Sequence, residues 1–409
     1  MKPLLLILKS KKSVVLADQF LYSGMNFIAT LFLARFLNTT DFGIYSTVVL
    51  TIFLIISLGN AFIIQPFQVA SEKFKKSRLY SNFLFFSQLL FIAIIALLTF
   101  IIYLFIPVSS YNFTSLIFFS IVIILHDYFR KYFLVKNKLI TVLIIDVLIA
   151  VGQFFSLLYL FHLHSGNLNT VFSFMGMSYL LAVIFSVLYL KPQLKRVNYW
   201  ILFFNYHMKE GLWLSLVSFI QWGSGNLFVV SLGVFINIEA LGAFRLIQSL
   251  FGVLNILFQT FENYVLPNAS RIYANSVVHS KKYIQKISLQ SAVLIGSVLT
   301  VLFIFSDQII QFAAGEKYAT YGYVVKGMCI LYFILFMGYP IRLSIRMLVL
   351  NKLFFVGYLL SFIFSILCFN YLLKYLQLNG VIVGLIINQL IMLLFWNYHL
   401  RRKGFYLWK

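Results

Sequence analysis

The chain has 409 residues, of which 62% are hydrophobic and only 10% are charged. A soluble domain is about half apolar and about a quarter charged, so no soluble fold of this length could bury so much apolar surface, and the bilayer must act as the solvent. The net charge of +22 would indicate nucleic-acid binding in a soluble protein. Cytoplasmic loops of membrane proteins collect Lys and Arg, and we attribute the positive charge to such loops. We therefore expect membrane lipids as partners and no nucleic acid.

Apolar runs separated by short polar breaks predict an all-α integral membrane protein with about twelve spanning helices. A basic start, 1–12, precedes the first run without an evident cleavage site, which predicts a retained first helix. In chain order we expect the spans at 14–37, 43–66, 82–106, 114–134, 140–161, 171–190, 211–236, 242–266, 288–311, 321–341, 353–376 and 380–400.

The positive charges alternate along this division. All but five of the 32 Lys and Arg residues fall at one set of helix ends. The five at the alternate ends are Arg35, Arg245, Lys317, Lys326 and Lys374. Because positive residues stay on the cytoplasmic side, this asymmetry predicts an even number of spans and cytoplasmic N- and C-termini.

An internal repeat joins the two halves of the chain. Gly24, Asn38 and Gly43 recur without a gap as Gly223, Asn237 and Gly242, six predicted spans later. The two copies therefore have the same orientation, which predicts two six-helix lobes as a parallel repeat, with a substrate site between them. We expect an N-terminal lobe at 1–190, a basic cytoplasmic linker at 191–210 and a C-terminal lobe at 211–409.

The first helical hairpin carries a family resemblance. Leu33-Ala34-Arg35-Phe36-Leu37, followed by Asp41-Phe42-Gly43-Ile44-Tyr45, resembles the polysaccharide or O-antigen flippases (Wzx type) of the multidrug/oligosaccharidyl-lipid/polysaccharide exporter superfamily. The resemblance implies a multi-pass protein of the bacterial cytoplasmic (inner) membrane. It would move an undecaprenyl-diphosphate-linked oligosaccharide, a repeat unit of O-antigen or another surface polysaccharide, to the outer leaflet by alternating access. Its partners would include the polysaccharide assembly machinery.

Polar residues on predicted span eight are the main site candidates. Arg245, Gln248, Ser249, Gly252, Asn255, Gln259, Glu262 and Asn263 recur every three or four residues on an otherwise apolar helix. They would either make interhelical hydrogen bonds or line a hydrated lumen that contacts the diphosphate and sugars. The lumen candidates are Arg245, Gln248, Ser249, Asn255 and Gln259.

Two further lumen candidates lie in span one. Asn26 belongs to a shorter polar stripe that starts at Asp18. Arg35 lies on the opposite side of the helix, near the outer boundary, where it could also snorkel.

Asp146 is the candidate for ion coupling. It lies within span five without a cation one turn away, which predicts either a tertiary ion pair or a proton or cation site. Asp127 precedes Arg130 and Lys131 by three and four residues, so a local salt bridge is expected there.

Several other functions are disfavoured. The two cysteines lack metal-ligand spacing, and His162 and His164 have no further ligands nearby, so no metal is expected. No Gly-rich GK[ST] loop is present, and the outer loops are too short for the catalytic groups of a membrane glycosyl polymerase. We therefore expect no enzyme activity and no cofactor. The alternative is a multidrug or cation extruder of the same fold, but Arg245 suits an anionic cargo better.

Overall fold

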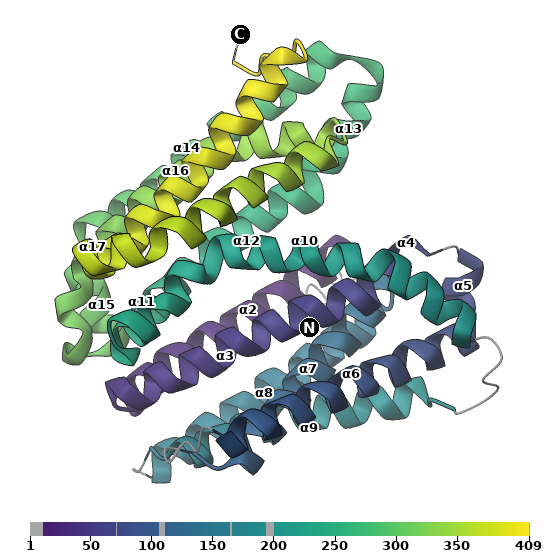
Figure 1. The fold of residues 1–409 in the computed structure, drawn as a ribbon, viewed down its shortest axis with the longest axis vertical. Helices are drawn as coiled ribbons and strands as arrows, with labels where there is room; N and C mark the ends of the chain where they lie inside the picture. The colour runs from purple at the N-terminus through teal and green to yellow at the C-terminus, as the bar shows by residue number, and fades with distance from the viewer. Residues whose placement is uncertain (1–10, 71, 106–110, 164–165, 194–199, 409) are drawn as a thin grey trace, which may run out of the picture. The chain divides into compact units, whose positions relative to one another are not determined.

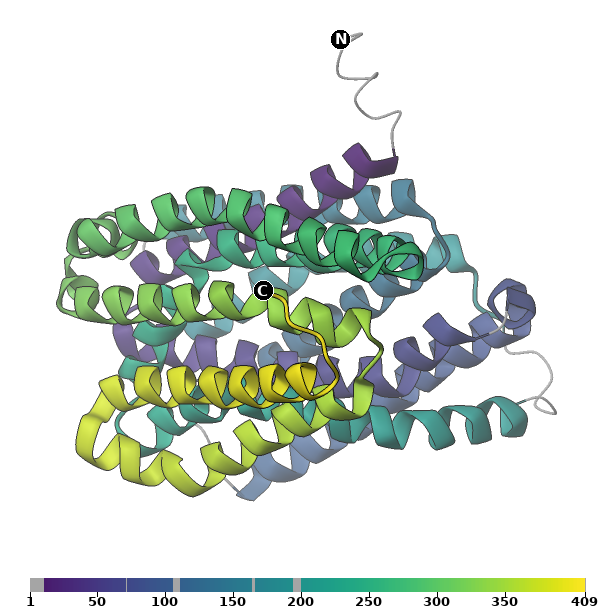
Figure 2. The same cartoon turned by 90° about the horizontal axis from the view of Figure 1, so that it is seen from above.

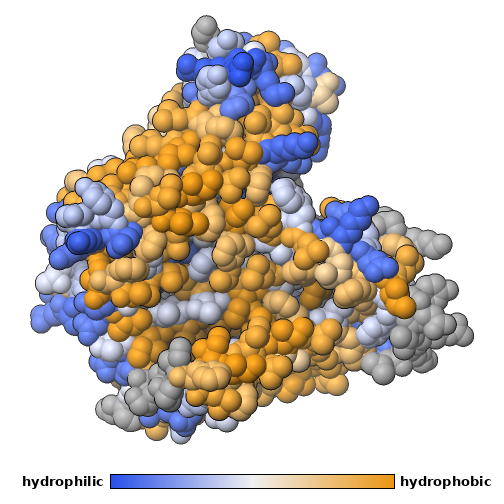
Figure 3. Space-filling view, in the orientation of Figure 1, coloured by the Kyte–Doolittle hydropathy of each residue, from blue (hydrophilic) through white to orange (hydrophobic). Residues whose placement is uncertain are grey.

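Helices make up nearly all of the protein. The computed structural model describes residues 11–70, 72–105, 111–163, 166–193 and 200–408, and these ranges contain no strand (Figures 1 and 2). Among them, nine helices are long and apolar enough to cross a membrane. Hydrophobic residues cover most of the face drawn in Figure 3, and hydrophilic residues gather toward helix ends. Such a surface is stable against lipid rather than water, so this is a multi-pass membrane protein.

The described residues form two compact units. Unit 1 comprises Met1–Asp41 and Val48–Phe219, and unit 2 comprises Phe42–Thr47 and Ile220–Lys409. The division falls inside two helices: α3 (Thr39–Gly59), whose residues Phe42–Thr47 belong to unit 2, and α10 (Trp200–Phe235). Residues 200–210, which we expected in a linker, are thus helical, while residues 194–199 lie outside the described ranges.

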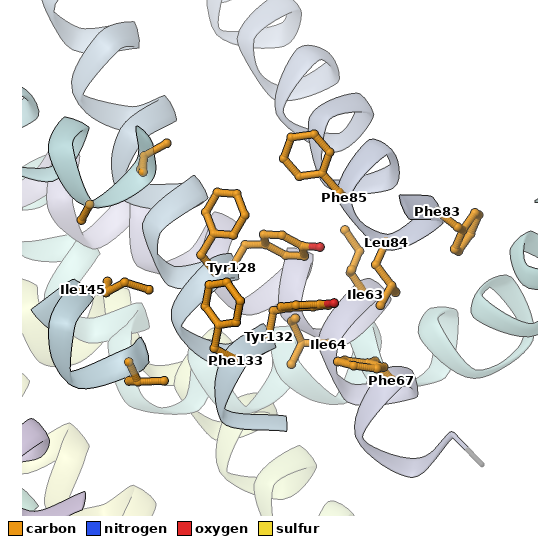
Figure 4. Close-up of a cluster of buried hydrophobic side chains, with 14 of the residues drawn as sticks. Ile63, Ile64, Phe67, Phe83, Leu84, Phe85, Tyr128, Tyr132, Phe133 and Ile145 are labelled. Carbon is orange, nitrogen blue, oxygen red and sulfur yellow. The ribbon is translucent and has the colours of Figure 1, made fainter. Parts of the chain in front are cut away.

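Unit 1 contains most of the N-terminal helices. They are α2 (Lys11–Phe36), α3 (Thr39–Gly59), the π-helix η1 (Asn60–Ile64), α4 (Gln65–Val69), α5 (Glu72–Lys76), α6 (Arg78–Phe105), α7 (Phe113–Val135), α8 (Leu139–Leu163), α9 (Leu168–Leu190) and the first part of α10. Isoleucines from η1 and mostly aromatic side chains from α4, α6 and α7 form its core (Figure 4). Phe67 stacks on Tyr132 with ring centroids 5.5 Å apart, and the Tyr132 hydroxyl donates to Ser81 at 2.8 Å. This core holds α7 in place.

Unit 2 contains the remaining helices. They are the rest of α10, α11 (Ile238–Leu250), α12 (Gly252–Thr260), the π-helix η3 (Phe261–Val265), α13 (Leu266–Asn275), α14 (Val277–Ile304), α15 (Ser306–Ala314), the 3-10 helix η4 (Glu316–Tyr321), α16 (Gly322–Met347) and α17 (Asn351–Arg402).

Helix α17 is a hairpin of two antiparallel segments. The backbone leaves helical geometry at Gln377, with φ of 49° and ψ of −128°. Trp396 Nε1 donates to Leu353 O at 3.1 Å, and Asn388 Nδ2 donates to Ser365 Oγ at 2.8 Å. The two segments therefore fold back on each other, at the place where the sequence predicts the turn between spans at 353–376 and 380–400.

Predicted span eight, expected as one helix over 242–266, differs most from expectation. It is interrupted at Phe251, widens into η3 and continues through α13 to Asn275. Gly252, a poor helix former, follows the interruption, and Pro267 follows η3. Proline cannot donate a backbone hydrogen bond and clashes with the carbonyl four residues earlier, and a wider π turn relieves that clash. The count of twelve spans stays a prediction.

The repeat seen in the sequence reappears in local structure. Asn38 and Asn237 both cap a helix, each accepting from the backbone N–H three residues on at 2.7 Å. Helix α3 leads into a π-helix and Pro66, and α11 continues through α12 into a π-helix and Pro267. In unit 2, a Cβ added to Gly242 would lie 2.9 Å from the Cα of Gly43. The two repeated glycines therefore mark a close approach of the helix starts.

Candidate functional site

Asp146, the ion-coupling candidate, lies fully buried in unit 1 and has a tertiary partner. Its Oδ2 accepts from Arg130 Nε at 2.9 Å, and Arg130 comes from the neighbouring helix α7. Of the two readings left open by the sequence, the ion pair is thus present. Asp127 pairs instead with Lys131, at 2.8 Å and one helical turn away.

Arg130 also binds a second carboxylate. Its Nη2 lies 2.6 Å from Asp18 Oδ2, and its guanidinium carbon lies 4.5 Å from the centre of the Tyr22 ring. Asp18 and Tyr22 belong to α2, so one arginine joins α2, α7 and α8. The side chains of Arg130, Asp18 and Asp146 are only 12%, 6% and 0% exposed.

The formal charges of this cluster do not balance. Two carboxylates face one guanidinium, so the cluster carries −1 while His126 is neutral. His126 Nε2 lies 3.6 Å from Asp146 Oδ1, and neither atom has a hydrogen-bond partner, as is also true of Asp18 Oδ1. An unbalanced charge away from water is costly. A single proton, held by His126 or by a carboxylate, would neutralise the cluster and supply the missing donor.

A chain of neutral polar groups continues from these charges. The His126 ring lies 5.3 Å from the Tyr179 ring. Tyr179 Oη and Gln153 Nε2 both donate to Asn26 Oδ1, at 3.2 and 3.3 Å. Asn26, expected to line a lumen, thus takes part in a network inside unit 1 that also includes Asp146. Arg35 is exposed at the end of α2.

The span-eight candidates lie in unit 2 and form two groups. Arg245 is half-buried and donates from Nη1 to Gln248 Oε1 at 2.9 Å, one turn along α11. Ser249 donates back to the Leu246 carbonyl at 2.6 Å. Beyond the break at Phe251, Asn255 accepts from Tyr332 Oη at 3.2 Å, and both Asn255 and Gln259 are exposed.

Sequence reasoning missed the connection between Asp18, His126 and Arg130. Asp18 was seen only as part of a helix stripe, and Arg130 only as a local partner of Asp127. A weak signal existed, because His126 and Arg130 are four residues apart and share one face of α7. Within the described ranges, no three His, Cys, Asp or Glu side chains are grouped to hold a metal ion.

Known proteins resemble this chain in fold but not in sequence. No family model matches, and no curated protein matches. Several solved structures do match. An inward-facing MATE-family multidrug resistance transporter of the MOP superfamily covers 94% of this chain and 94% of its own, with TM-score 0.75 and 10% identity. The lipid II flippase MurJ in an inward closed conformation covers 95% and 88%, with TM-score 0.71 and 13% identity. An outward-facing MATE-family transporter covers 97% of both chains, with TM-score 0.52 and 11% identity.

These proteins are transporters or flippases, and the match covers nearly the whole of each chain. The chain therefore has the fold that MATE transporters share with the lipid II flippase MurJ.

Proposed function

We propose that this protein is a flippase for an undecaprenyl-diphosphate-linked oligosaccharide in the bacterial inner membrane. It would carry a repeat unit of O-antigen or another surface polysaccharide by alternating access of two six-helix lobes, 1–190 and 211–409, with both termini cytoplasmic. The fold supports this proposal because one similar structure, MurJ, is a flippase for a lipid-linked substrate.

The environment of Arg245 is the observation that best supports an anionic substrate. Its guanidinium is half-buried and, within the described residues, makes a hydrogen bond to Gln248 but no ion pair. A cation without a carboxylate partner favours an anionic ligand, and the arginine fork matches phosphate oxygens. Gln248 orients the fork, so we assign the pair Arg245 and Gln248 to the diphosphate, and Ser249, Asn255 and Gln259 to sugar hydroxyls.

The cluster of Asp18, His126, Arg130 and Asp146 would couple transport to a proton. Its charge of −1 favours one bound cation, and the burial of both carboxylates favours a proton over any larger ion. The same negative charge is the one feature that favours the alternative, a multidrug or cation extruder. That alternative is weaker, because side chains 6% and 0% exposed leave no surface for an organic cation.

Complementation of a strain lacking the native gene tests the role of Arg245. Arg245→Ala should abolish surface glycan at normal membrane abundance, and Arg245→Glu should be at least as severe. Arg245→Lys should retain partial export, because it keeps the charge but loses the fork. Arg271→Ala, which removes an exposed arginine of α13, is the matched control and should export normally. Normal glycan with Arg245→Ala would show that Arg245 is only a boundary residue.

A further inference from the structure

Helices α7 and α16 end in turns of the same type. An arginine precedes each turn by the same number of residues. The turn residues Asn137 and Val349 have φ of 56° and 54°. The backbone amides on either side of each turn residue donate to carbonyls at equivalent positions. Examples are Lys138 N to Phe133 O and Leu350 N to Ile345 O. Seven residues before Asn137 lies Arg130, and seven residues before Val349 lies Arg342.

The two aligned arginines have opposite charge surroundings. Arg130 is shared by two carboxylates, whereas Arg342 shares one carboxylate with a second arginine. Arg342 Nη2 lies 2.9 Å from Glu262 Oε1, and Arg346 Nη1 contacts Glu262 Oε2. Among the described residues Glu262 is the only carboxylate paired with either arginine. This cluster, Glu262 with Arg342 and Arg346, therefore carries a formal charge of +1.

The donors of this cluster exceed its acceptors. Glu262 Oε1 also accepts from Tyr339 Oη at 3.1 Å, so this carboxylate already has several hydrogen-bond donors. Arg342 Nε is buried and has no hydrogen-bond partner. A cavity of about 10 Å³ lies beside Arg342, lined also by Tyr339, Tyr358 and Trp396. That volume holds about one water or one ligand oxygen, so most of a ligand would lie outside it.

Aromatic rings hold the two guanidinium groups in place. Arg342 lies 5.5 Å from the Tyr339 ring centre and 5.8 Å from that of Phe354, and Arg346 lies 5.9 Å from Phe354. Phe354 in turn stacks on Trp396 with centroids 5.2 Å apart. The side chains of Arg342 and Arg346 remain 30% and 36% exposed. Two fixed guanidinium groups with an accessible side suit a bidentate oxyanion.

We propose that Arg342 and Arg346 bind a phosphate group carried on a lipid, with Glu262 as the internal anion that holds them when the site is empty. Where that lipid is the substrate, the site rests on the function proposed above. It would then be a second site for the diphosphate, near the end of α16 that the charge pattern assigns to the cytoplasm, whereas Arg245 lies at a predicted outer end. A phospholipid headgroup offers the same chemistry, and the experiment separates the two sources.

Native mass spectrometry of the purified full chain tests this site. The probes are undecaprenyl diphosphate, phosphatidylglycerol and undecaprenol, which lacks phosphate. Arg342→Gln with Arg346→Gln should weaken binding of a phosphate-bearing lipid about tenfold or more, since hydrogen bonds to charged groups are lost. Glu262→Gln should strengthen it, because the competing anion is gone. Lys352→Gln removes an exposed cation near the same end of α16 and should change nothing.

Each result decides one point. Selective loss of undecaprenyl diphosphate assigns the site to the substrate, and equal loss of both phosphate lipids assigns it to lipid phosphate in general. Unchanged binding in the double variant, or equal binding of undecaprenol, overturns the proposal. Should the double variant not fold, weaker binding with Glu262→Gln, which keeps both arginines, overturns it as well. The function proposed above is tested separately by glycan export in Arg245 variants.

Discussion

At the scale of single residues, Arg130 determines whether the polar interior of unit 1 is stable. It is the one cation paired with Asp18 and Asp146 among the described residues. Loss of one partner of a buried pair leaves an uncompensated charge and costs about 3–5 kcal/mol. Loss of Asp146 instead leaves one arginine with one aspartate, which is a balanced pair. The two changes should therefore differ strongly in effect.

Arg130→Gln should lower the melting temperature and membrane abundance far more than Asp146→Asn. Adding Asp146→Asn to Arg130→Gln should restore part of the loss, because one buried carboxylate is removed. Lys131→Gln, at the partly exposed pair with Asp127, is the matched control and should cost much less than Arg130→Gln. Thermal unfolding in detergent measures the order, and a double variant no better than Arg130→Gln would contradict the charge count.

Proton coupling gives Asp146→Asn a second expected outcome. Glycan export by the folded variant should no longer fall when the proton gradient is collapsed, since Asp18 and Arg130 then balance each other and the cluster needs no proton. Export by the unmutated protein should fall under the same treatment. An equal response of both proteins would show that Asp146 takes no part in coupling. Its structural role would be unaffected by that result.

At the scale of helices, the π turn before Pro66 leaves a backbone carbonyl that needs a hydrogen-bond donor from another helix. The proline ring displaces the carbonyl of Phe62, and that carbonyl accepts from His207 Nδ1 at 2.7 Å instead. Since Nδ1 must carry the proton, Nε2 accepts from Tyr80 Oη, also at 2.7 Å. Gly211, one turn beyond His207, has no room for a Cβ beside the Phe62 ring. Together these contacts attach α10 to the kink between α3 and α4.

His207→Phe should destabilise the protein more than Tyr80→Phe. The first change leaves a buried carbonyl without a donor, at about 1–3 kcal/mol, while the second removes one hydrogen bond and keeps the donor to Phe62. Melting temperatures in detergent compare the two variants. Equal losses would mean that the Phe62 carbonyl finds another partner.

At the scale of the whole molecule, positive charge sets orientation. Only five of 32 Lys and Arg residues fall at the predicted outer ends. A reporter fused after residue 110 or 165 should therefore read external, and one after residue 200 or 278 should read cytoplasmic. Fusions after 200 and 278 serve as controls for insertion. A cytoplasmic reading at 165 would refute the arrangement of six plus six spans.

The sequence by itself determined the membrane class, the helical fold and the polar residues worth testing. These follow from composition, from apolar runs of spanning length and from charge asymmetry, all of which can be seen along the chain without knowing which residues meet. The hairpin at 377–379 was likewise predicted, because a break between two long apolar runs is a local signal.

Only the tertiary structure decided which polar residues meet. Arg130 and Asp146 come from consecutive helices, but Asp18 lies 112 residues before Arg130, and no local pattern sets the rotation of one helix against another. The π turn before Pro66 likewise depends on a partner from another helix, since His207 of α10 contacts the Phe62 carbonyl. The balance of charge at Glu262, Arg342 and Arg346 arises in the same way, from side chains whose partners lie in other helices.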